Sequence, residues 1–298
     1  MGKKILLADS GTGQSEDMLK YLMEIPALKD SQVTVLHVVP PEVSSDDMAD
    51  KLKAGADLLA KAIAKLGLPA EQVSPMLQQG DPKTVVCKAA EDLDTDLIVM
   101  GSRGLKRLQS ILDNSVSQYV FQLSSRPMLL VKDDIYVKRL NRLMIAVDQS
   151  EASQQAVAEA IAFARDIKGE QLILVHTDSK LKAGEEVSGD QDPVLATAIA
   201  AARRYNIDFR AISIGGKPGP TLCKIAEERN VDLLMVGSPD RRPSIAKGLP
   251  DLDRLLGNSL SDYVRVNAPC PVLLTRPAAK VSGPLVKATK ATTDYKIP

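Results

Sequence analysis

The residues best suited to hold a phosphate group lie in the run DLIVMGSRGLKRLQSILDNSVS, from Asp96 to Ser117. An apolar stretch typical of a buried strand ends at a turn, Gly101 to Gly104, whose two glycines permit positive φ and close approach of the backbone to a ligand. Asn114 and Ser115 then begin a predicted helix with residue types that favour an N-cap. Backbone N–H groups and the positive end of a helix dipole attract phosphate oxygens. The residues alone leave a second interpretation open: the glycines only turn the chain, and Ser115 only caps a helix.

The elements around this run alternate between strand and helix. In the first half, apolar runs and turn residues predict strands at Lys4–Asp9, Gln32–Val39, Val73–Gln79, Leu97–Met100 and Met128–Val131. Helical spacing, Gly67 as a C-cap and Pro82 near a helix start predict helices at Gln14–Glu24, Ser45–Leu66, Pro82–Leu93 and Asn114–Leu123. This order predicts an α/β fold in which a parallel sheet is covered on both faces. Ligands of such sheets bind at the carboxyl ends of the strands, where Asp9, Val38 and Gly101 fall.

The chain contains the same unit twice. Gly80–Ser102 matches Gly216–Ser238 with ten identical residues at a constant offset of 136, and flanking segments match at offsets of 139 and 144. A repeat of this length is too long for a solenoid and indicates a duplicated domain. We therefore predict domains at 1–133 and 140–277, packed in one chain as a pseudo-dimer, and a poorly ordered tail at 278–298. Pairing of two chains into a homodimer would fit the same architecture.

Composition narrows the function classes. With 298 residues, 44% of them hydrophobic and 26% charged, the chain has the make-up of an ordinary globular protein. The 38 basic and 38 acidic residues balance, and aromatic residues make up only 3%, which argues against a nucleic-acid or membrane-surface partner. No segment has the pattern of a signal peptide or a membrane span, so we expect a cytoplasmic protein. Cys87, Cys223 and Cys270 have no metal-ligand spacing and are predicted to be small buried residues.

Several segments together resemble the universal stress proteins, in the tandem form of that family. They are the opening strand with Asp9, matched by Asp148 in the second half; the run Leu36-His37-Val38; VMGSRG; NSVS and NSLSDYV; and the closing APCPVLL. The resemblance covers Lys4 to about Arg276. It implies two open five-stranded parallel sheets with strand order 3-2-1-4-5, of the Rossmann-like type that binds adenine nucleotides. Many members, though not all, bind ATP or AMP through the pattern G-x2-G-x9-G-[ST].

That pattern transfers to the first half with one departure. Gly101, Gly104 and Ser115 match, but Asn114 stands where the family has its third glycine. Asparagine tolerates a left-handed backbone better than most residues, so the phosphate turn can survive there. In the second half Asp240 replaces the second glycine, and a fixed carboxylate beside phosphates is repulsive unless a metal lies between them. The second copy is therefore predicted to be degenerate.

The resemblance implies a cofactor site for ATP or AMP, with Mg²⁺ as a possible companion of the nucleotide. The implied site residues are Asp9, Val38, Met100, Gly101, Ser102, Gly104, Asn114, Ser115 and Val116. Val38 would meet the adenine and Met100 the base or ribose, while the glycines, serines and helix start would hold the phosphates. Asp9 would lie near the ribose or the nucleotide and its metal. An alternative role for Asp9 is to cap the helix that begins near Gly13.

Three functions follow from these features. The leading hypothesis is a stress-response regulator whose first half binds an adenine nucleotide and thereby alters the surface offered to a protein partner. The second is a nucleotide-free scaffold, or a stress protein that holds an apolar ligand in its second half. The third is an enzyme that hydrolyses ATP slowly, although no catalytic constellation is visible: neither His37 nor His176 has an evident acid–base partner in the sequence.

Overall fold

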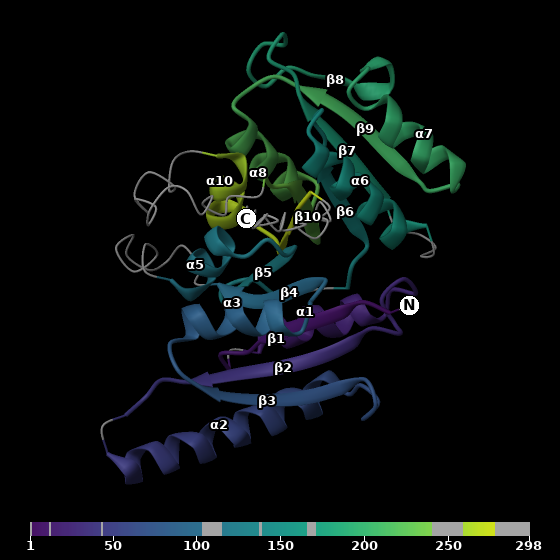
Figure 1. Cartoon of the computed structure of the whole chain (residues 1–298). Helices are drawn as coiled ribbons and strands as arrows, with labels where there is room; N and C mark the ends of the chain where they lie inside the picture. The colour runs from purple at the N-terminus through teal and green to yellow at the C-terminus, as the bar shows by residue number, and fades with distance from the viewer. Residues whose placement is uncertain are drawn as a thin grey trace, which may run out of the picture.

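The computed structural model describes residues 2–11, 13–42, 44–102, 115–136, 139–165, 171–239 and 259–277. In the first half, five strands lie side by side in the order β3-β2-β1-β4-β5, and every neighbouring pair is parallel (Figure 1). They are β1 (Lys4–Ala8), β2 (Gln32–Val39), β3 (Val73–Gln79), β4 (Leu97–Ser102) and β5 (Met128–Lys132). The predicted order 3-2-1-4-5 is confirmed for this half, and strand bounds agree with the prediction to within two residues.

The second half repeats the arrangement and adds to it. Its five main strands are β6 (Arg142–Ala146), β7 (Gln171–Thr177), β9 (Phe209–Ile214), β10 (Leu233–Gly237) and β11 (Val272–Thr275). They lie in the equivalent order β9-β7-β6-β10-β11. A short strand, β8 (Glu186–Ser188), pairs antiparallel with β9 at the outer edge and runs into a 3₁₀ turn, η1 (Gly189–Gln191). This addition was not predicted, because three residues are too few to show a strand pattern.

The two predicted five-stranded sheets are joined edge to edge, a connection that the sequence did not predict. β5 and β11 pair antiparallel, with Leu129 opposite Leu273, and so unite both halves in one sheet of eleven strands. Each strand would otherwise be an exposed edge, and pairing the two edges satisfies their backbone groups. The halves are thus related across this junction in the way that two subunits would be.

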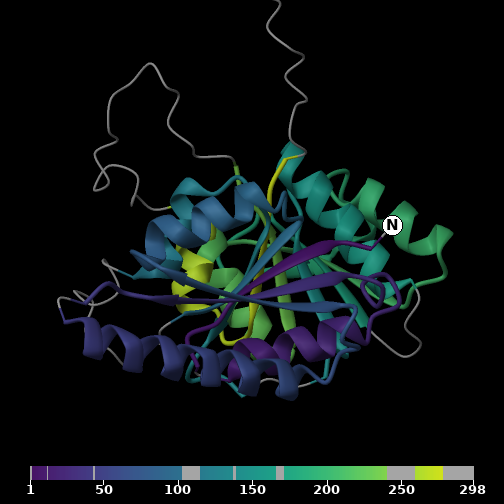
Figure 2. The same cartoon turned by 60° about the horizontal axis from the view of Figure 1, so that its bottom comes forward.

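Helices cover both faces of the sheet. They are α1 (Gln14–Met23), α2 (Ser45–Leu66), α3 (Pro82–Asp92), α5 (Val116–Leu123), α6 (Glu151–Ala164), α7 (Ala196–Arg204), α8 (Pro218–Glu228) and α10 (Leu260–Asn267). Figure 2 shows α1 and α2 on one side of the first-half sheet and α3 on the other. Strand residues alternate between two cores: Leu7 packs with the residues of α1 and α2, whereas Leu6 packs with those of α3 and α5. Near-continuous apolar strands are what a sheet buried on both faces requires.

Local chemistry sets the helix ends. Ser44 and Asp81 each accept a hydrogen bond from a backbone N–H in the first turn of the helix that follows, α2 and α3 respectively. Pro82 occupies the first turn of α3, where a missing N–H costs nothing. Gly67 ends α2 with φ of 62°, in the left-handed region that glycine adopts without strain, and confirms the predicted C-cap.

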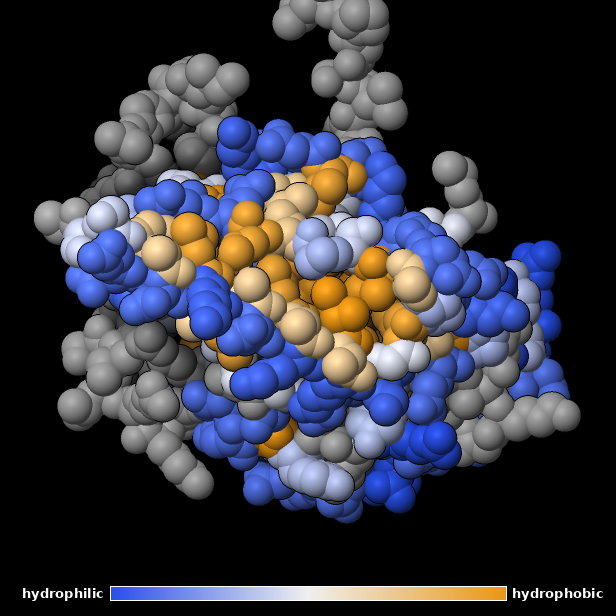
Figure 3. Space-filling view, turned by 90° about the horizontal axis from the view of Figure 1, so that it is seen from below, coloured by the Kyte–Doolittle hydropathy of each residue, from blue (hydrophilic) through white to orange (hydrophobic). Residues whose placement is uncertain are grey.

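The free edge of the sheet in the first half is β3. Seen from below, this end of the molecule carries apolar side chains gathered in a patch with a hydrophilic border (Figure 3). Val73, Met76 and Leu77 of the edge strand β3 are half-buried. Within the part of the chain that the structure describes, no helix is both long enough and apolar enough to cross a membrane.

Candidate functional site

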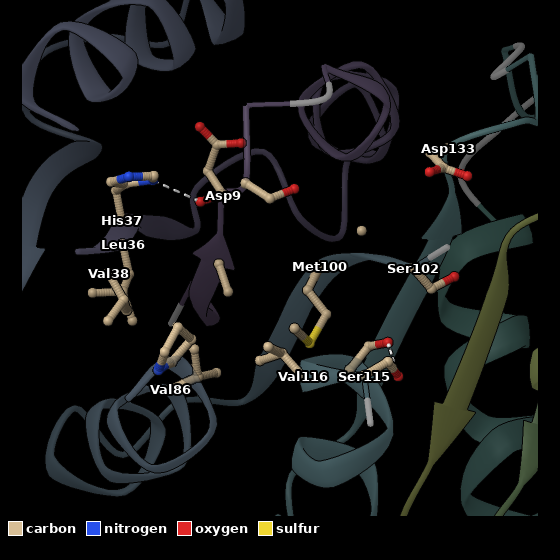
Figure 4. A pocket seen from close by; sticks show the side chains of 15 residues that line it. Asp9, Leu36, His37, Val38, Val86, Met100, Ser102, Ser115, Val116 and Asp133 are labelled. Atoms are coloured by element: carbon tan, nitrogen blue, oxygen red, sulfur yellow. Dashed lines mark hydrogen bonds between the residues drawn. The ribbon is translucent and has the colours of Figure 1, made fainter. Parts of the chain in front are cut away.

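A cavity of about 400 Å³ opens at the carboxyl ends of β1, β2 and β4, between the first turns of α3 and α5. This is the sheet edge at which the parallel topology predicts a ligand. Fifteen residues line it (Figure 4): Ala8, Asp9, Ser10, Leu36, His37, Val38, Pro82, Val86, Met100, Gly101, Ser102, Ser115, Val116, Ser117 and Asp133.

Seven of the nine predicted site residues are brought together around this cavity. They are Asp9, Val38, Met100, Gly101, Ser102, Ser115 and Val116. The other two, Gly104 and Asn114, lie outside the described residues, as do Asp240 of the second half and the tail at 278–298. The interpretation of Asn114 as a tolerated replacement for glycine therefore stays a prediction.

The cavity has two chemically different ends. Figure 4 shows Leu36, Val38 and Val86 at one end, Met100 and Val116 in the middle, and Ser102, Ser115 and Asp133 at the other end. A flat apolar ring suits the first end, since it would remove apolar surface from water. A group rich in hydrogen-bond acceptors suits the serine hydroxyls and the helix start at the second end.

Asp9 is buried but only half satisfied. Its residue is 6% exposed, and its Oδ1 accepts a hydrogen bond of 2.7 Å from the Gly11 N–H. Its other oxygen, Oδ2, is buried and has no hydrogen-bond partner among the described residues. The alternative role as a helix cap is wrong, because the N-cap of α1 is Gly13 at φ of 91° and no side chain caps it. Asp9 instead closes the turn after β1, beside the cavity that the residue lines.

Ser115 caps a helix, as one of the two interpretations of its sequence predicted. The Ser115 Oγ caps α5 by accepting a hydrogen bond of 3.1 Å from the Gln118 N–H. The preceding N–H groups, of Val116 and Ser117, have no acceptor within the part of the chain described. At the same end of the cavity, the Ser102 Oγ is buried and has no partner among the described residues. Capping therefore leaves donors at this end for a ligand.

The corresponding serine of the second half is fully engaged. Ser238 aligns with Ser102, and its Oγ donates to the Ser261 Oγ at 3.2 Å while it accepts from Arg276 Nη1 at 3.0 Å. Arg276 is 3% exposed and also donates to the carbonyls of Pro239 and Phe121, each at 2.5 Å. Its guanidinium stacks on the Phe121 ring, 4.7 Å from the ring centre. Ser238 thus has partners for its hydroxyl, whereas the equivalent Ser102 Oγ has none among the described residues.

Arg276 also joins the halves, because Phe121 belongs to α5 of the first half. The junction has an equivalent contact on its other side: Lys132, the last residue of β5, occupies the position that corresponds to Arg276 and donates at 2.6 Å to the carbonyl of Ala268 at the end of α10. Each cation thus meets the carbonyls in or just after the last turn of a helix of the opposite half. Cations are stabilised there by the helix dipole and by direct hydrogen bonds.

A second buried carboxylate lies near Asp9. Glu16 is 4% exposed in the first turn of α1 and accepts a hydrogen bond of 3.0 Å from the Ser15 Oγ. Burial, and next the charge of Asp9, raise the pKa of Glu16 above its ordinary value. An acid whose pKa is raised by folding destabilises the protein when it ionises, so its cost appears as the pH rises through and above its ordinary value of 4.5.

Glu16→Gln is therefore expected to raise the free energy of unfolding by about 1 kcal/mol at pH 7. The amide keeps a group that Ser15 can reach and removes the buried charge. The gain should shrink as the pH falls toward 4.5, because wild-type Glu16 is then neutral too. Urea denaturation at several pH values measures this, with Asp17→Asn as the control, since Asp17 is more exposed and pairs with Lys65 at 2.9 Å. A gain that is independent of pH would contradict the assignment.

Some lining residues were not predicted as site residues. Asp133 follows β5 directly, and since β5 neighbours β4 at the same sheet edge, this position could have been found from the topology. His37 has its Nδ1 3.0 Å from the Asp9 carbonyl oxygen and so links the ends of β1 and β2. Pro82 and Val86 reach the cavity from α3, whose orientation no local pattern fixes.

The three cysteines are free thiols with suppressed reactivity. Cys270 is buried as predicted, whereas Cys87 and Cys223 are only half-buried. Burial raises the pKa of Cys87 and of Cys223 to about 11, and that of Cys270 to about 12. Since the thiolate is the reactive form, none of them has the character of a catalytic nucleophile. Among the residues described, no group of three or more His, Cys, Asp or Glu side chains is arranged to hold a metal ion.

Comparison with models of known protein families shows to which family the chain belongs. The model of the universal stress protein family matches residues 1–132 and again residues 140–276. The chain belongs to this family. The two matches also support its tandem arrangement.

The relatives include proteins that match nearly the whole chain and proteins that match about half of it. A universal stress protein of Mycolicibacterium smegmatis is 23% identical over 296 residues, which cover 92% of this chain and 97% of the relative. A single-domain universal stress protein of Thermus aquaticus is 30% identical over 139 residues, 44% of this chain and all of the relative. The crystal structure of a universal stress protein from Archaeoglobus fulgidus shares the fold, with a TM-score of 0.67 at 21% identity over 92% of this chain and 96% of that one.

Proposed function

We propose that this universal stress protein is a stress-response regulator that binds one adenine nucleotide, in its first half. One observation carries the proposal: two buried oxygens, Asp9 Oδ2 and Ser102 Oγ, have no partner among the described residues and both belong to residues that line the same cavity. Buried polar atoms are nearly always hydrogen-bonded in folded proteins, and an unsatisfied one costs about 1–3 kcal/mol. A bound ligand with hydroxyl and phosphate groups would satisfy both.

The two ends of the cavity give the nucleotide a direction. The adenine would pack against Leu36, Val38 and Val86, where its apolar faces lose contact with water. The ribose hydroxyls would donate to the carboxylate of Asp9, since a carboxylate accepts hydrogen bonds and has none to donate. The phosphate would accept from Ser102 and from the N–H groups at the start of α5. Where ATP is the ligand, Mg²⁺ would be held by its phosphates with help from a carboxylate such as Asp9.

The proposed regulatory step uses the connection between the cavity and the junction. Asp133 lines the cavity and directly follows Lys132, which bonds to the second half. A ligand bound in the cavity would thus contact the segment that joins the halves. A shift of this segment would change the surface to which a partner protein binds. The protein partner, the cytoplasmic location and pairing into a homodimer belong to the same proposal; light scattering of the purified protein measures the last of these.

Isothermal titration calorimetry with AMP tests the proposed binding. We expect heat of binding with a stoichiometry of one nucleotide per chain, since Arg276 already donates to the Ser238 hydroxyl, the second-half equivalent of Ser102. Two sites per chain would contradict the proposed difference between the halves. No heat and no thermal shift at millimolar AMP would overturn nucleotide binding and favour the nucleotide-free scaffold.

Ser102→Ala is expected to weaken AMP binding by about fivefold to tenfold, because it removes one hydrogen bond to the phosphate. It should leave the ligand-free protein as stable as the wild type or more so, since the lost hydroxyl has no partner among the described residues. The matched control is Ser238→Ala, which should leave AMP affinity unchanged and lower stability by about 1 kcal/mol through its bonds to Ser261 and Arg276. Calorimetry and urea denaturation of both variants measure the contrast; equal effects of the two on AMP affinity would contradict it.

A further inference from the structure

The last turn of α5 is held by the second half of the chain. Arg276 Nη2 donates to the Phe121 carbonyl, and the Arg276 guanidinium stacks on the Phe121 ring. A second guanidinium of that half, Arg265 of α10, lies 5.8 Å from the centre of the same ring. Beside it, Gln122 Nε2 donates to Asp262 Oδ1 at 3.3 Å. None of these residues lines the cavity, which α5 reaches only with its first residues.

The first turn of α5 is held differently from that of its counterpart α10. In the second half, the Ser238 Oγ at the end of β10 donates to the Ser261 Oγ of α10 at 3.2 Å, so strand end and helix start are bonded to each other. In the first half, the Ser102 Oγ has no partner among the described residues, and the Ser117 Oγ lies 3.4 Å from the Ser115 Oγ of its own helix start. In the described part of the chain, these hydroxyls thus leave α5 unbonded to β4 at the cavity, whereas its far end is bonded to the second half.

From these contacts we infer that Arg276 of the second half is a positioning residue for the phosphate site of the first half. The inference rests on the proposed nucleotide binding and names the residue through which the second half contributes to it. Arg276 acts by fixing the place of α5, whose first N–H groups would hold the phosphate. The second half is then a part of the binding device, although it binds no nucleotide itself.

The physical reason is that a short helix moves as one body. α5 has 8 residues, and Phe121 lies five residues beyond Val116, about 7.5 Å along the helix axis. A shift of the last turn therefore moves the first turn by a similar distance. Hydrogen bonds to a phosphate weaken steeply outside a narrow range of distance and angle, so a displacement of about 1 Å removes most of their contribution. The base and the ribose would contact β2, α3 and Asp9, and these contacts do not involve α5.

Calorimetric titration of the full chain with AMP and with adenosine, which lacks the phosphate, tests the inference. In Arg276→Ala we expect the affinity for AMP to fall about tenfold and the affinity for adenosine to fall by less than about twofold. Arg276→Lys retains the charge and perturbs the fold less. It should lower the AMP affinity about threefold, because lysine lacks the planar guanidinium that donates to several acceptors.

Asp192→Ala is the matched control for a loss of stability in the second half. Asp192 follows η1 and accepts from His176 Nδ1 at 2.7 Å and from Ser213 Oγ of β9 at 2.5 Å. Its removal leaves two donors without their acceptor, as Arg276→Ala leaves acceptors without their donor. The contacts of α5 stay intact, so we expect the AMP affinity of Asp192→Ala to equal that of the wild type.

The outcomes distinguish the inference from the function on which it rests. An unchanged AMP affinity in Arg276→Ala would overturn the positioning role and leave nucleotide binding intact. Equal losses of AMP and adenosine affinity in Arg276→Ala, or an equal loss of AMP affinity in Asp192→Ala, would assign the effect to general loss of structure and overturn the role of Arg276. Failure of the wild type to bind either AMP or adenosine would overturn the proposed function, and the positioning role with it.

Discussion

Asp9→Asn is expected to weaken AMP binding by at least about tenfold and, at the same time, to stabilise the ligand-free protein by about 1 kcal/mol. The affinity falls because a ribose hydroxyl loses a charged acceptor, and hydrogen bonds to charged groups contribute about 1.5–3 kcal/mol. The stability rises because the buried Oδ2 has no partner among the described residues and because the Asp9 charge opposes ionisation of Glu16. The amide retains an oxygen for the Gly11 N–H, so the turn after β1 should survive.

Calorimetry with AMP and urea denaturation without it measure the two effects. Asp148→Asn is the control, since Asp148 occupies the same strand end in the second half, is exposed, and closes its own turn by accepting from the Ser150 N–H at 2.8 Å. It should change neither quantity by much. Loss of stability in Asp9→Asn, with unchanged affinity, would show that Asp9 is a structural residue and not part of a binding site.

Arg276→Ala is expected to lower the free energy of unfolding by about 3 kcal/mol or more. The substitution leaves the Phe121 and Pro239 carbonyls without their donor, removes a bond to Ser238 and exposes the Phe121 ring to an empty space. Losing partners of buried polar groups and opening a cavity are the mechanisms that give large effects. Since Phe121 lies in the first half, the variant should also make unfolding of the halves less cooperative.

Urea denaturation followed by circular dichroism tests this prediction. Arg139→Ala is the control, because its side chain is 72% exposed and its pairing with Glu24 should contribute little. The loss of stability in Arg276→Lys should lie between those of Arg276→Ala and Arg139→Ala. Lysine keeps the positive charge, but it lacks the planar guanidinium that donates to several acceptors at once. A loss below about 1 kcal/mol in Arg276→Ala would contradict the structural role assigned to this contact.

Local patterns were sufficient for most of the fold. Strand bounds such as Gln32–Val39 and helix bounds such as Ser45–Leu66 follow from apolar spacing and capping residues, and both are confirmed. Two features of the fold were not predicted, for different reasons. β8 is too short to carry a pattern, and the pairing of β5 with β11 depends on how two distant edges meet, which no local signal encodes.

The candidate site was predictable to a similar degree. Residues at strand ends and helix starts, such as Asp9 and Ser115, follow from the topology and from the repeat. The hydrogen bonding of their polar atoms does not: Ser238 bonds to Ser261 and Arg276, both distant in sequence, whereas Ser102 Oγ has no partner among the described residues. The sequence argument for a degenerate second half used Asp240, which lies outside the described residues, whereas the structure supports it through Arg276.

The difference between the halves is tested most directly by a crystal structure of the protein grown with excess AMP. We predict density for one nucleotide per chain, with its base near Val38, its ribose at Asp9 and its phosphate at Ser102 and Ser115. Ser238 should keep its hydrogen bond to Arg276. A nucleotide bound against Ser238 with Arg276 displaced, or a first-half cavity that stays empty at saturating AMP, would contradict the account.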